Sequence, residues 1–210
     1  MQFARTGIAA LAAAMALWGP SVLAQPKEFQ IDRSHSSINF EIDHWGFARV
    51  AGRFNDFSGK VVLDEADLAK AAIELTVKAD SIDTNHKARD QHLRTADFFD
   101  AAKFPAIVFK STKVELIADR KGGKLTGDLT LHGVTKPVTL DFKLTKEGNA
   151  PHPAYKNLRM AAFQVTGQIK RSEFDMKFGI PAVGDAVDLK FHIDIIHCVG
   201  EAVEAPSCKY

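Results

Sequence analysis

Hydrophobic and polar positions alternate along most of this chain, and the alternation predicts β-strands. Two alternating runs, residues 37–44 and 50–63, lie on either side of Gly46. The alternation shifts by one position at Asn55-Asp56, which predicts a bulge or a sharp bend there. Strict alternation is typical of an antiparallel strand with one buried face, and the buried face here is rich in phenylalanine.

The same pattern recurs toward the C-terminus and predicts about eight strands in all. Residues 132–137 predict the clearest hairpin turn, and Gly122-Gly123 predicts another turn. Strands with one polar and one apolar face, joined by short turns, are typical of a closed antiparallel barrel, with a flat sandwich as the alternative. After the first two runs, strands are expected at residues 73–79, 107–116, 125–131, 138–144, 161–169 and 187–195.

The segment 81–105 interrupts the alternation. Its first residues can cap a helix, residues 88–93 are good helix formers, and Pro105 ends any helix that precedes it. We therefore expect one or two short helices, with their apolar side covering one end of the barrel. The overall expectation is an all-β fold with a short helical insertion.

The N-terminus resembles a leader for export. Arg5 is followed by an apolar stretch, residues 8–18, and Val22-Leu23-Ala24 fits a signal peptidase site. We expect a signal peptide over residues 1–24 and one mature domain over residues 25–210. A membrane anchor is the alternative, although the apolar stretch is short for a transmembrane helix.

Charge excludes one class of partner. Loss of Arg5 with the leader reduces 27 basic residues to 26, which equals the number of acidic residues. A neutral mature chain lacks the basic surplus of a nucleic-acid-binding protein.

The two cysteines, Cys198 and Cys208, lie close together near the C-terminus. An exported chain meets an oxidising compartment, so a disulfide between them is the expected state. A metal pair is the alternative, but the spacing is not that of a CxxC motif.

Several motifs, spread over nearly the whole mature chain, resemble those of the YceI-like family. One departure is Asp175, which stands where the family pattern has glycine. The motifs are DxxHS at residues 32–36, RDxHLxxxDFFD at 89–100, KFP at 103–105, FKST at 109–112, LxGxLTLHGVTKPV at 125–138 and RSxF at 171–174.

The resemblance implies a lipocalin-like barrel in the periplasm. Such a protein would bind a long polyisoprenoid lipid, of isoprenoid quinone or polyprenyl type, or a fatty-acid-like amphiphile, for transport, storage or sequestration. Dimers are common in that family, so a homodimer is possible. We expect no cofactor beyond the lipid ligand, and a binding protein rather than an enzyme.

The inward rows supply the expected ligand-binding residues. Phenylalanine can line a dry channel because it needs no hydrogen-bond partner, although the same rows would also suit a filled core. The expected set is Phe40, Ile42, Phe54, Ile73, Leu75, Phe98, Phe99, Leu129, Leu131, Leu140, Phe163 and Phe191, with Phe174, Met176 and Phe178 near a rim.

Two polar residues complete this set. His44 falls on the apolar face of its strand, either as a structural residue beside the turn or as a functional one. Arg89 could anchor the helical segment or clamp a ligand head group, because its planar fork suits phosphate or quinone oxygens.

Other functions remain as alternatives at this point. An enzyme acting on a bound lipid would need a polar residue inside the apolar rows, and His44 is the best candidate. No catalytic residues and no metal ligands are expected, since the histidines show neither HxH nor HExxH spacing, although three distant strands could still assemble a site. An interaction or chaperone-like protein using the loop 146–156 is a further alternative.

Overall fold

The structure is a computed structural model that describes residues 25–64, 66–151, 153–155, 158–198 and 208. The predicted signal peptide lies outside the described residues. Within the described part of the chain, no helix is both long enough and apolar enough to span a bilayer.

The described chain forms eleven antiparallel strands in one sheet, with one α-helix and four short 3₁₀ helices. The strands are β1 (Lys27–Ile31), β2 (Ser37–His44), β3 (Ala48–Phe54), β4 (Phe57–Leu63), β5 (Ala72–Lys78), β6 (Ile82–Asp83), β7 (Ala106–Leu116), β8 (Gly122–Leu131), β9 (Val134–Asn149), β10 (Arg159–Lys170) and β11 (Val183–His197). The helices are α1 (Lys87–Leu93), η1 (Leu68–Lys70), η2 (Ala79–Ser81), η3 (Pro153–Tyr155) and η4 (Arg171–Phe174).

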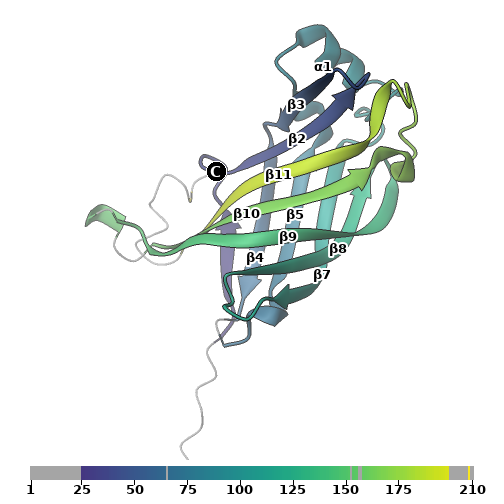
Figure 1. The fold of residues 1–210 in the computed structure, drawn as a ribbon. Coiled ribbons are helices and arrows are strands. Elements are labelled where there is room, and N and C mark those ends of the chain that lie inside the picture. The colour runs from purple at the N-terminus through teal and green to yellow at the C-terminus, as the bar shows by residue number, and fades with distance from the viewer. Residues whose placement is uncertain (1–24, 65, 152, 156–157, 199–207, 209–210) are drawn as a thin grey trace, which may run out of the picture.

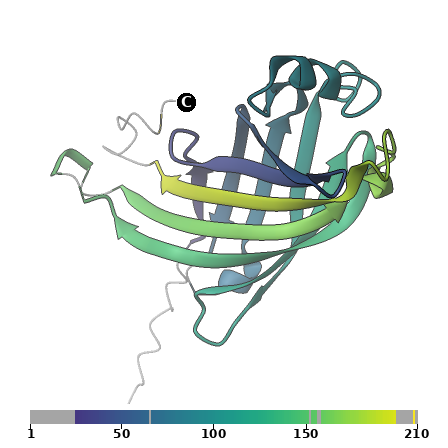
Figure 2. The same ribbon diagram turned by 45° about the horizontal axis from the view of Figure 1, so that its top comes forward.

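Eight of the strands close into a barrel, as the sequence predicts. Their order is β1-β4-β5-β7-β8-β9-β10-β11, and β1 pairs back onto β11 to complete the ring. The sheet continues from β11 through β2, β3 and β6, so β11 is bordered by three strands. Figure 2 shows the long green and yellow strands curving across the blue strands behind them. The flat sandwich is therefore excluded.

Burial along the strands follows the predicted alternation. In β5 the side chains alternate between exposed and half-buried from Ala72 to Glu74 and onward, until Val77 is fully buried. Because side chains of a strand alternate between its two faces, each strand contributes one apolar row to the interior.

The irregularity expected at Asn55-Asp56 is a sharp bend rather than a bulge. The chain leaves β3, which pairs with β2 and β6, and enters β4, which pairs with β1 and β5. The bend moves the chain from the extension of the sheet into the barrel itself.

The turn predicted at Gly122-Gly123 is wrong. Both glycines lie in β8, where Gly123 pairs with Leu116 and Phe142, and the turn spans residues 117–121. Backbone oxygens of the neighbouring strands approach both glycines too closely for a side chain. Glycine is therefore required here inside a strand, although a pair of glycines usually indicates a turn.

The hairpin predicted over residues 132–137 has a shorter turn than expected. Only His132 and Gly133 form it, with φ angles of 52° and 77°. Positive φ at both central residues is the geometry of the two-residue turns that suit twisted antiparallel strands. Residues 134–137 already belong to β9.

The helical segment lies at one end of the barrel, beyond the ends of β2 and β3 (Figure 1). Its backbone is held by Asp90, a buried carboxylate that accepts hydrogen bonds from the amide (2.9 Å) and hydroxyl (2.5 Å) of Thr84. Phe99 packs edge-on against Phe54, with 5.6 Å between ring centroids. The segment therefore covers this end, as predicted.

Cys198 and Cys208 form a disulfide with an S–S distance of 2.02 Å. Both pack against a small cluster around Leu158 and Ile196, which is separate from the barrel core. The disulfide thus fixes Cys208 beside the last strand, and it excludes the metal alternative for these two residues.

Candidate functional site

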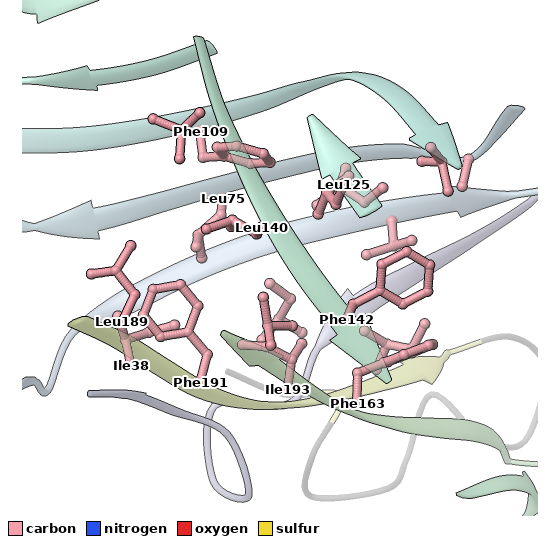
Figure 3. A pocket seen from close by; sticks show the side chains of 18 of the residues that line it. Ile38, Leu75, Phe109, Leu125, Leu140, Phe142, Phe163, Leu189, Phe191 and Ile193 are labelled. Carbon is pink, nitrogen blue, oxygen red and sulfur yellow. The ribbon is translucent and has the colours of Figure 1, made fainter. Parts of the chain in front are cut away.

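The barrel interior contains a cavity of about 660 Å³. All eight barrel strands contribute to its lining, together with β2 and β3. Figure 3 shows the side chains of Leu75, Phe109 and Leu140, among others, pointing into one common space. Native cores rarely contain voids much larger than a water molecule, and ligand pockets span about 300–1,000 Å³. The interior is therefore a hollow of ligand size and not a filled core.

Glycines in the barrel wall make room for the largest side chains. The ring of Phe109 lies over Gly127, where a methyl group would come within 2.7 Å of its Cε2 atom. Leu140 lies in the same way against Gly167, and Phe40 against Gly52. Each of these side chains thus occupies the space beside the sheet that a side chain at the glycine would need.

The end of the barrel next to α1 is closed. Phe99 and Met176 line the cavity there, and Phe174 seals it from behind with a side chain that is 1% exposed. His132 contacts the carbonyl oxygen of Phe174 through Nδ1 at 3.2 Å, which ties the β8–β9 turn to η4. A ligand cannot enter through this layer without displacing it.

The opposite end of the cavity reaches the surface at what we call the mouth. Its charged residues are Asp119, Arg120, Lys121, Glu147 and Arg159, on the β7–β8 turn, β9 and β10. These are the only charged side chains among the described residues that line the cavity, and apart from Asn39 the rest of its lining is apolar. The cavity is therefore amphipathic along its length, with a dry barrel and a charged mouth.

Most of the predicted ligand-binding residues line this cavity. They come from seven strands, from the segment after α1 and from the segment after η4, which the structure brings together around one space. The lining members are Phe40, Phe54, Ile73, Leu75, Phe99, Leu129, Leu131, Leu140, Phe163, Met176 and Phe191.

Six predicted residues lie outside the lining, and four of them are apolar. Ile42 lies on β2 between Val50 and Val187, in the part of the sheet that extends beyond the barrel. Phe174 belongs to the core layer that closes the barrel end. The ring of Phe98 packs against Phe178, and Phe178 is 48% exposed at the surface. Alternation could not exclude Ile42, which shares its row with Phe40, and it does not apply to the three phenylalanines, which lie outside the strands.

The two polar candidates also lie outside the cavity. His44 is the last residue of β2, and its ring stacks on Trp45 with 4.7 Å between centroids. Arg89 donates from Nε to the hydroxyl of Thr84 (2.7 Å) and from Nη2 to its carbonyl oxygen (2.8 Å). Arg89 thus anchors the helical segment, and these contacts argue against the head-group clamp.

Sequence reasoning missed other lining residues. Phe109, Leu125, Phe142, Val165 and Ile193 stand in alternating rows, so the pattern contained them without favouring them over their neighbours. The charged residues of the mouth gave no signal, because they come from the β7–β8 turn, β9 and β10, and nothing along the chain shows that these segments border one cavity.

A polar cluster lies at the β1–β2 connection, away from the cavity lining. The buried carboxylate of Asp32 accepts hydrogen bonds from the amide (2.9 Å) and hydroxyl (2.6 Å) of Ser34, and its Oδ2 lies 2.8 Å from Nδ1 of His35. This hydrogen bond raises the pKa of His35, and the charge of Asp32 adds to the effect. Burial raises the pKa of the nearby Asp194 carboxyl, and repulsion by Asp32 adds to that.

This cluster does not have the arrangement of a catalytic triad. The Ser34 hydroxyl and the Asp32 carboxylate both meet the same nitrogen of His35, Nδ1, at 3.0 and 2.8 Å. A general base needs the nucleophile on one ring nitrogen and the orienting carboxylate on the other. Among the described residues, no group of three or more His, Cys, Asp or Glu side chains could hold a metal ion.

The family follows from a comparison of the sequence with known families. The model described as "YceI-like domain" matches residues 29–195, which span the barrel from β1 to β11. The chain belongs to the YceI-like family. The resemblance of its sequence motifs to this family is thus confirmed.

Relatives support the assignment over most of the chain. A UPF0312 protein of Vibrio parahaemolyticus is 42% identical over 190 residues, covering 88% of this chain and 93% of the relative. Protein YceI of Escherichia coli O157:H7 is 39% identical over 169 residues, covering 80% of this chain and 85% of the relative.

Solved structures with the same fold include two informative ones. BcnA of Burkholderia cenocepacia superposes with a TM-score of 0.68 at 26% identity, over 78% of this chain and 98% of BcnA. A domain from Saccharophagus degradans, described as a polyisoprenoid-binding domain, gives a TM-score of 0.58 at 16% identity, over 80% and 97% of the two chains. The second likeness shows the fold alone.

Proposed function

We propose that this protein is a periplasmic binding protein that holds the tail of a long-chain isoprenoid lipid inside its barrel. The cavity supports the proposal: about 660 Å³ of space surrounded by aliphatic and phenyl side chains, closed at one end and reaching the surface at the other. A long apolar chain with its head at the mouth fits such a space. The Saccharophagus degradans domain, which shares the fold, is described as polyisoprenoid-binding, and this suggests the same ligand class here.

Burial of apolar surface would drive the binding. Each CH₂ group removed from water contributes about 0.8 kcal/mol, so a tail of a dozen carbons supplies ample free energy without any polar contact. Because Asn39 is the one polar residue of the described lining apart from the charged mouth, length and shape of the tail would set most of the selectivity. The ligand would be carried, stored or sequestered unchanged, and isoprenoid quinones belong to the candidate class.

The first experiment identifies the native ligand. Protein purified from the periplasm without detergent is measured by native mass spectrometry, then extracted with organic solvent to identify the released compound. We expect a stoichiometric isoprenoid. A mass equal to that of the mature chain alone, with no uptake of added polyprenyl lipid, would refute the proposal. The same spectrum gives the mass of the mature N-terminus, expected at Gln25, and shows whether the protein is a homodimer.

A matched pair of variants tests the site. Leu125 points into the cavity, and its neighbour Lys124 points outward, where it pairs with Asp141 at 2.9 Å. Leu125→Trp should fill the path of the tail and lower lipid affinity at least tenfold, while Lys124→Trp should leave it unchanged. Thermal unfolding of both proteins controls for folding. Equal lipid affinities of the two folded variants would mean that the ligand binds elsewhere.

A lipid-modifying enzyme is the competing function, and it is weaker. The one polar residue expected inside the apolar rows, His44, lies outside the cavity. Recovery of the same lipid, unaltered after prolonged incubation with the protein, is the outcome expected for a binding protein.

A further inference from the structure

The mouth of the cavity carries more positive than negative side chains. The β7–β8 turn presents Arg120 and Lys121 side by side, and β10 adds Arg159, against the carboxylates of Asp119 and Glu147. Three cations against two anions leave the mouth with a net charge of +1, although the mature chain as a whole is neutral. The surplus stands where the head group of a bound amphiphile would lie.

The carboxylates at the mouth are already engaged. Glu147 pairs with Arg159 at 3.0 Å, so this pair is neutral in sum. Asp119 accepts a hydrogen bond from the backbone amide of Lys121 at 2.8 Å, which uses one carboxylate oxygen to hold the turn. No ion pair joins Arg120 or Lys121 to a carboxylate among the described residues. These two side chains are therefore available to a ligand.

The turn that bears them has a fixed backbone. The amide of Arg120 donates to the carbonyl oxygen of Ile117 at 2.9 Å, and the carbonyl oxygen of Lys121 accepts from the amide of Leu144 on β9 at 2.8 Å. Arg120 holds a left-handed backbone conformation, with φ at 58°. The turn is thus tied to β9, and its two cations are kept at the rim of the cavity.

We propose that the mouth selects an amphiphile with an anionic head group, a phosphate or a carboxylate, which Arg120 and Lys121 bind while the apolar tail fills the barrel. An arginine fork and a lysine ammonium are the groups that recognise phosphate and carboxylate oxygens. Burial of the apolar tail supplies most of the affinity. The two cations discriminate between ligands that have the same tail but a charged or a neutral head group. The inference rests on the proposed function, because it presupposes that the tail occupies the cavity.

The test compares ligands that differ only in the head. Geranylgeraniol, geranylgeranyl monophosphate and the corresponding geranylgeranoic acid are titrated by displacement of a fluorescent lipid from the whole mature protein. At low salt we expect the phosphate to bind about tenfold more tightly than the alcohol. The preference should shrink in high salt, because salt screens exposed charges. A preference for the acid equal to that for the phosphate means that the mouth recognises either anionic head, and a preference for the phosphate alone assigns a phosphate site.

Variants at the mouth separate the head from the tail. The double variant Arg120→Gln and Lys121→Gln should bind the phosphate only about as tightly as the alcohol, with the alcohol affinity unchanged. Asp119→Asn is the matched control: it removes a negative charge, retains an acceptor for the turn, and should strengthen binding of the phosphate several-fold. Inorganic phosphate alone should not displace the lipid probe, and displacement by it would mean that the mouth binds free anions.

The outcomes distinguish the two proposals. If the wild-type protein binds alcohol and phosphate equally, the head-group site is refuted while the lipid-binding function stands. If none of the three ligands binds, the proposed function fails, and the head-group inference fails with it. A double variant that retains the preference would overturn the assignment to Arg120 and Lys121.

Discussion

Asp175 occupies a backbone conformation that few side chains tolerate. It ends η4 with φ at 63° and ψ at 14°, and its amide donates to the carbonyl oxygens of Arg171 and Ser172. The left-handed region is the usual place of glycine, and aspartate and asparagine enter it at lower cost than other residues. Asp175 stands where the sequence resemblance expects glycine, and aspartate is one of the few other residues that fit this conformation. Lys177 lies 2.7 Å from its carboxylate, on the exposed side of the loop.

The conformation predicts an order of stability at this position. Asp175→Ala should lower the free energy of unfolding by about 1 kcal/mol, because a Cβ without a polar group gains nothing in the left-handed region. Asp175→Gly should match or exceed the wild type. Chemical denaturation of the three proteins gives the order, and an alanine variant as stable as the glycine variant would contradict it.

His35 illustrates a second property that resides in single residues. Its Nδ1 lies 2.8 Å from a carboxylate that is fully buried, that of Asp32, yet its own side chain is 63% exposed. The hydrogen bond and the charge of Asp32 raise its pKa above the ordinary value of 6.5. The folded state favours the protonated ring. The pair therefore adds fully to the free energy of unfolding below pH 6.5, and its contribution disappears as the pH rises through the raised pKa of His35.

A histidine-to-glutamine variant makes this pH dependence measurable. The wild type should exceed His35→Gln in unfolding free energy by a few tenths to about 1 kcal/mol below pH 6.5, since exposure weakens the pair. The difference should shrink at higher pH. Denaturation curves at several pH values, with the His35 pKa followed by NMR, check both parts. If the difference in unfolding free energy between the two proteins grew with pH, protonation of His35 would not stabilise the folded state.

At the scale of elements, alternation located most strands and failed where a strand is too short to show it. The run at residues 73–79 corresponds to β5, and that at 125–131 falls within β8, which begins earlier at Gly122. β1 was not expected at all, because Lys27–Ile31 is only five residues long and its alternation rests on two apolar residues, Phe29 and Ile31. The last strand runs from Val183 to His197, longer than predicted, since its ends pair with β2 and β1 outside the regular rows. Pairing partners, unlike periodicity, cannot be seen in one segment.

The disulfide is an element whose contribution can be measured directly. It joins residues ten positions apart, and closing a loop of this size should stabilise the folded state by about 2–3 kcal/mol in the chain-entropy account. The double variant Cys198→Ser and Cys208→Ser should lose about this amount. Lipid affinity should not change, because the cluster around Leu158 and Ile196 is separate from the cavity lining. A loss of lipid affinity in a folded variant would contradict this separation.

At the scale of the molecule, the hollow interior is a collective property. The sequence placed the large apolar side chains on the inward faces, but the same rows would serve a filled core. What decides between the two is the closure of eight strands and the way rings such as Phe109 lie against wall glycines. Neither the size of the ring nor the position of Gly127 opposite Phe109 is visible along the chain. For the same reason the mouth could not be foreseen, since Lys121 and Arg159 become neighbours of one opening only after closure.

The closure of the barrel also decides when the cavity comes into being. β1 meets β11 at two residue pairs, Gln30 with Ile196 and Ile31 with Ile195, which join nearly the first described residues to the last. Contacts between such distant residues form slowly, and until they form the inner faces of the other strands are open to water and prone to aggregate. A lipid present at that moment would cover the inner faces that the closed barrel encloses. The supply of ligand would then control how much protein folds, in addition to how much of it is loaded.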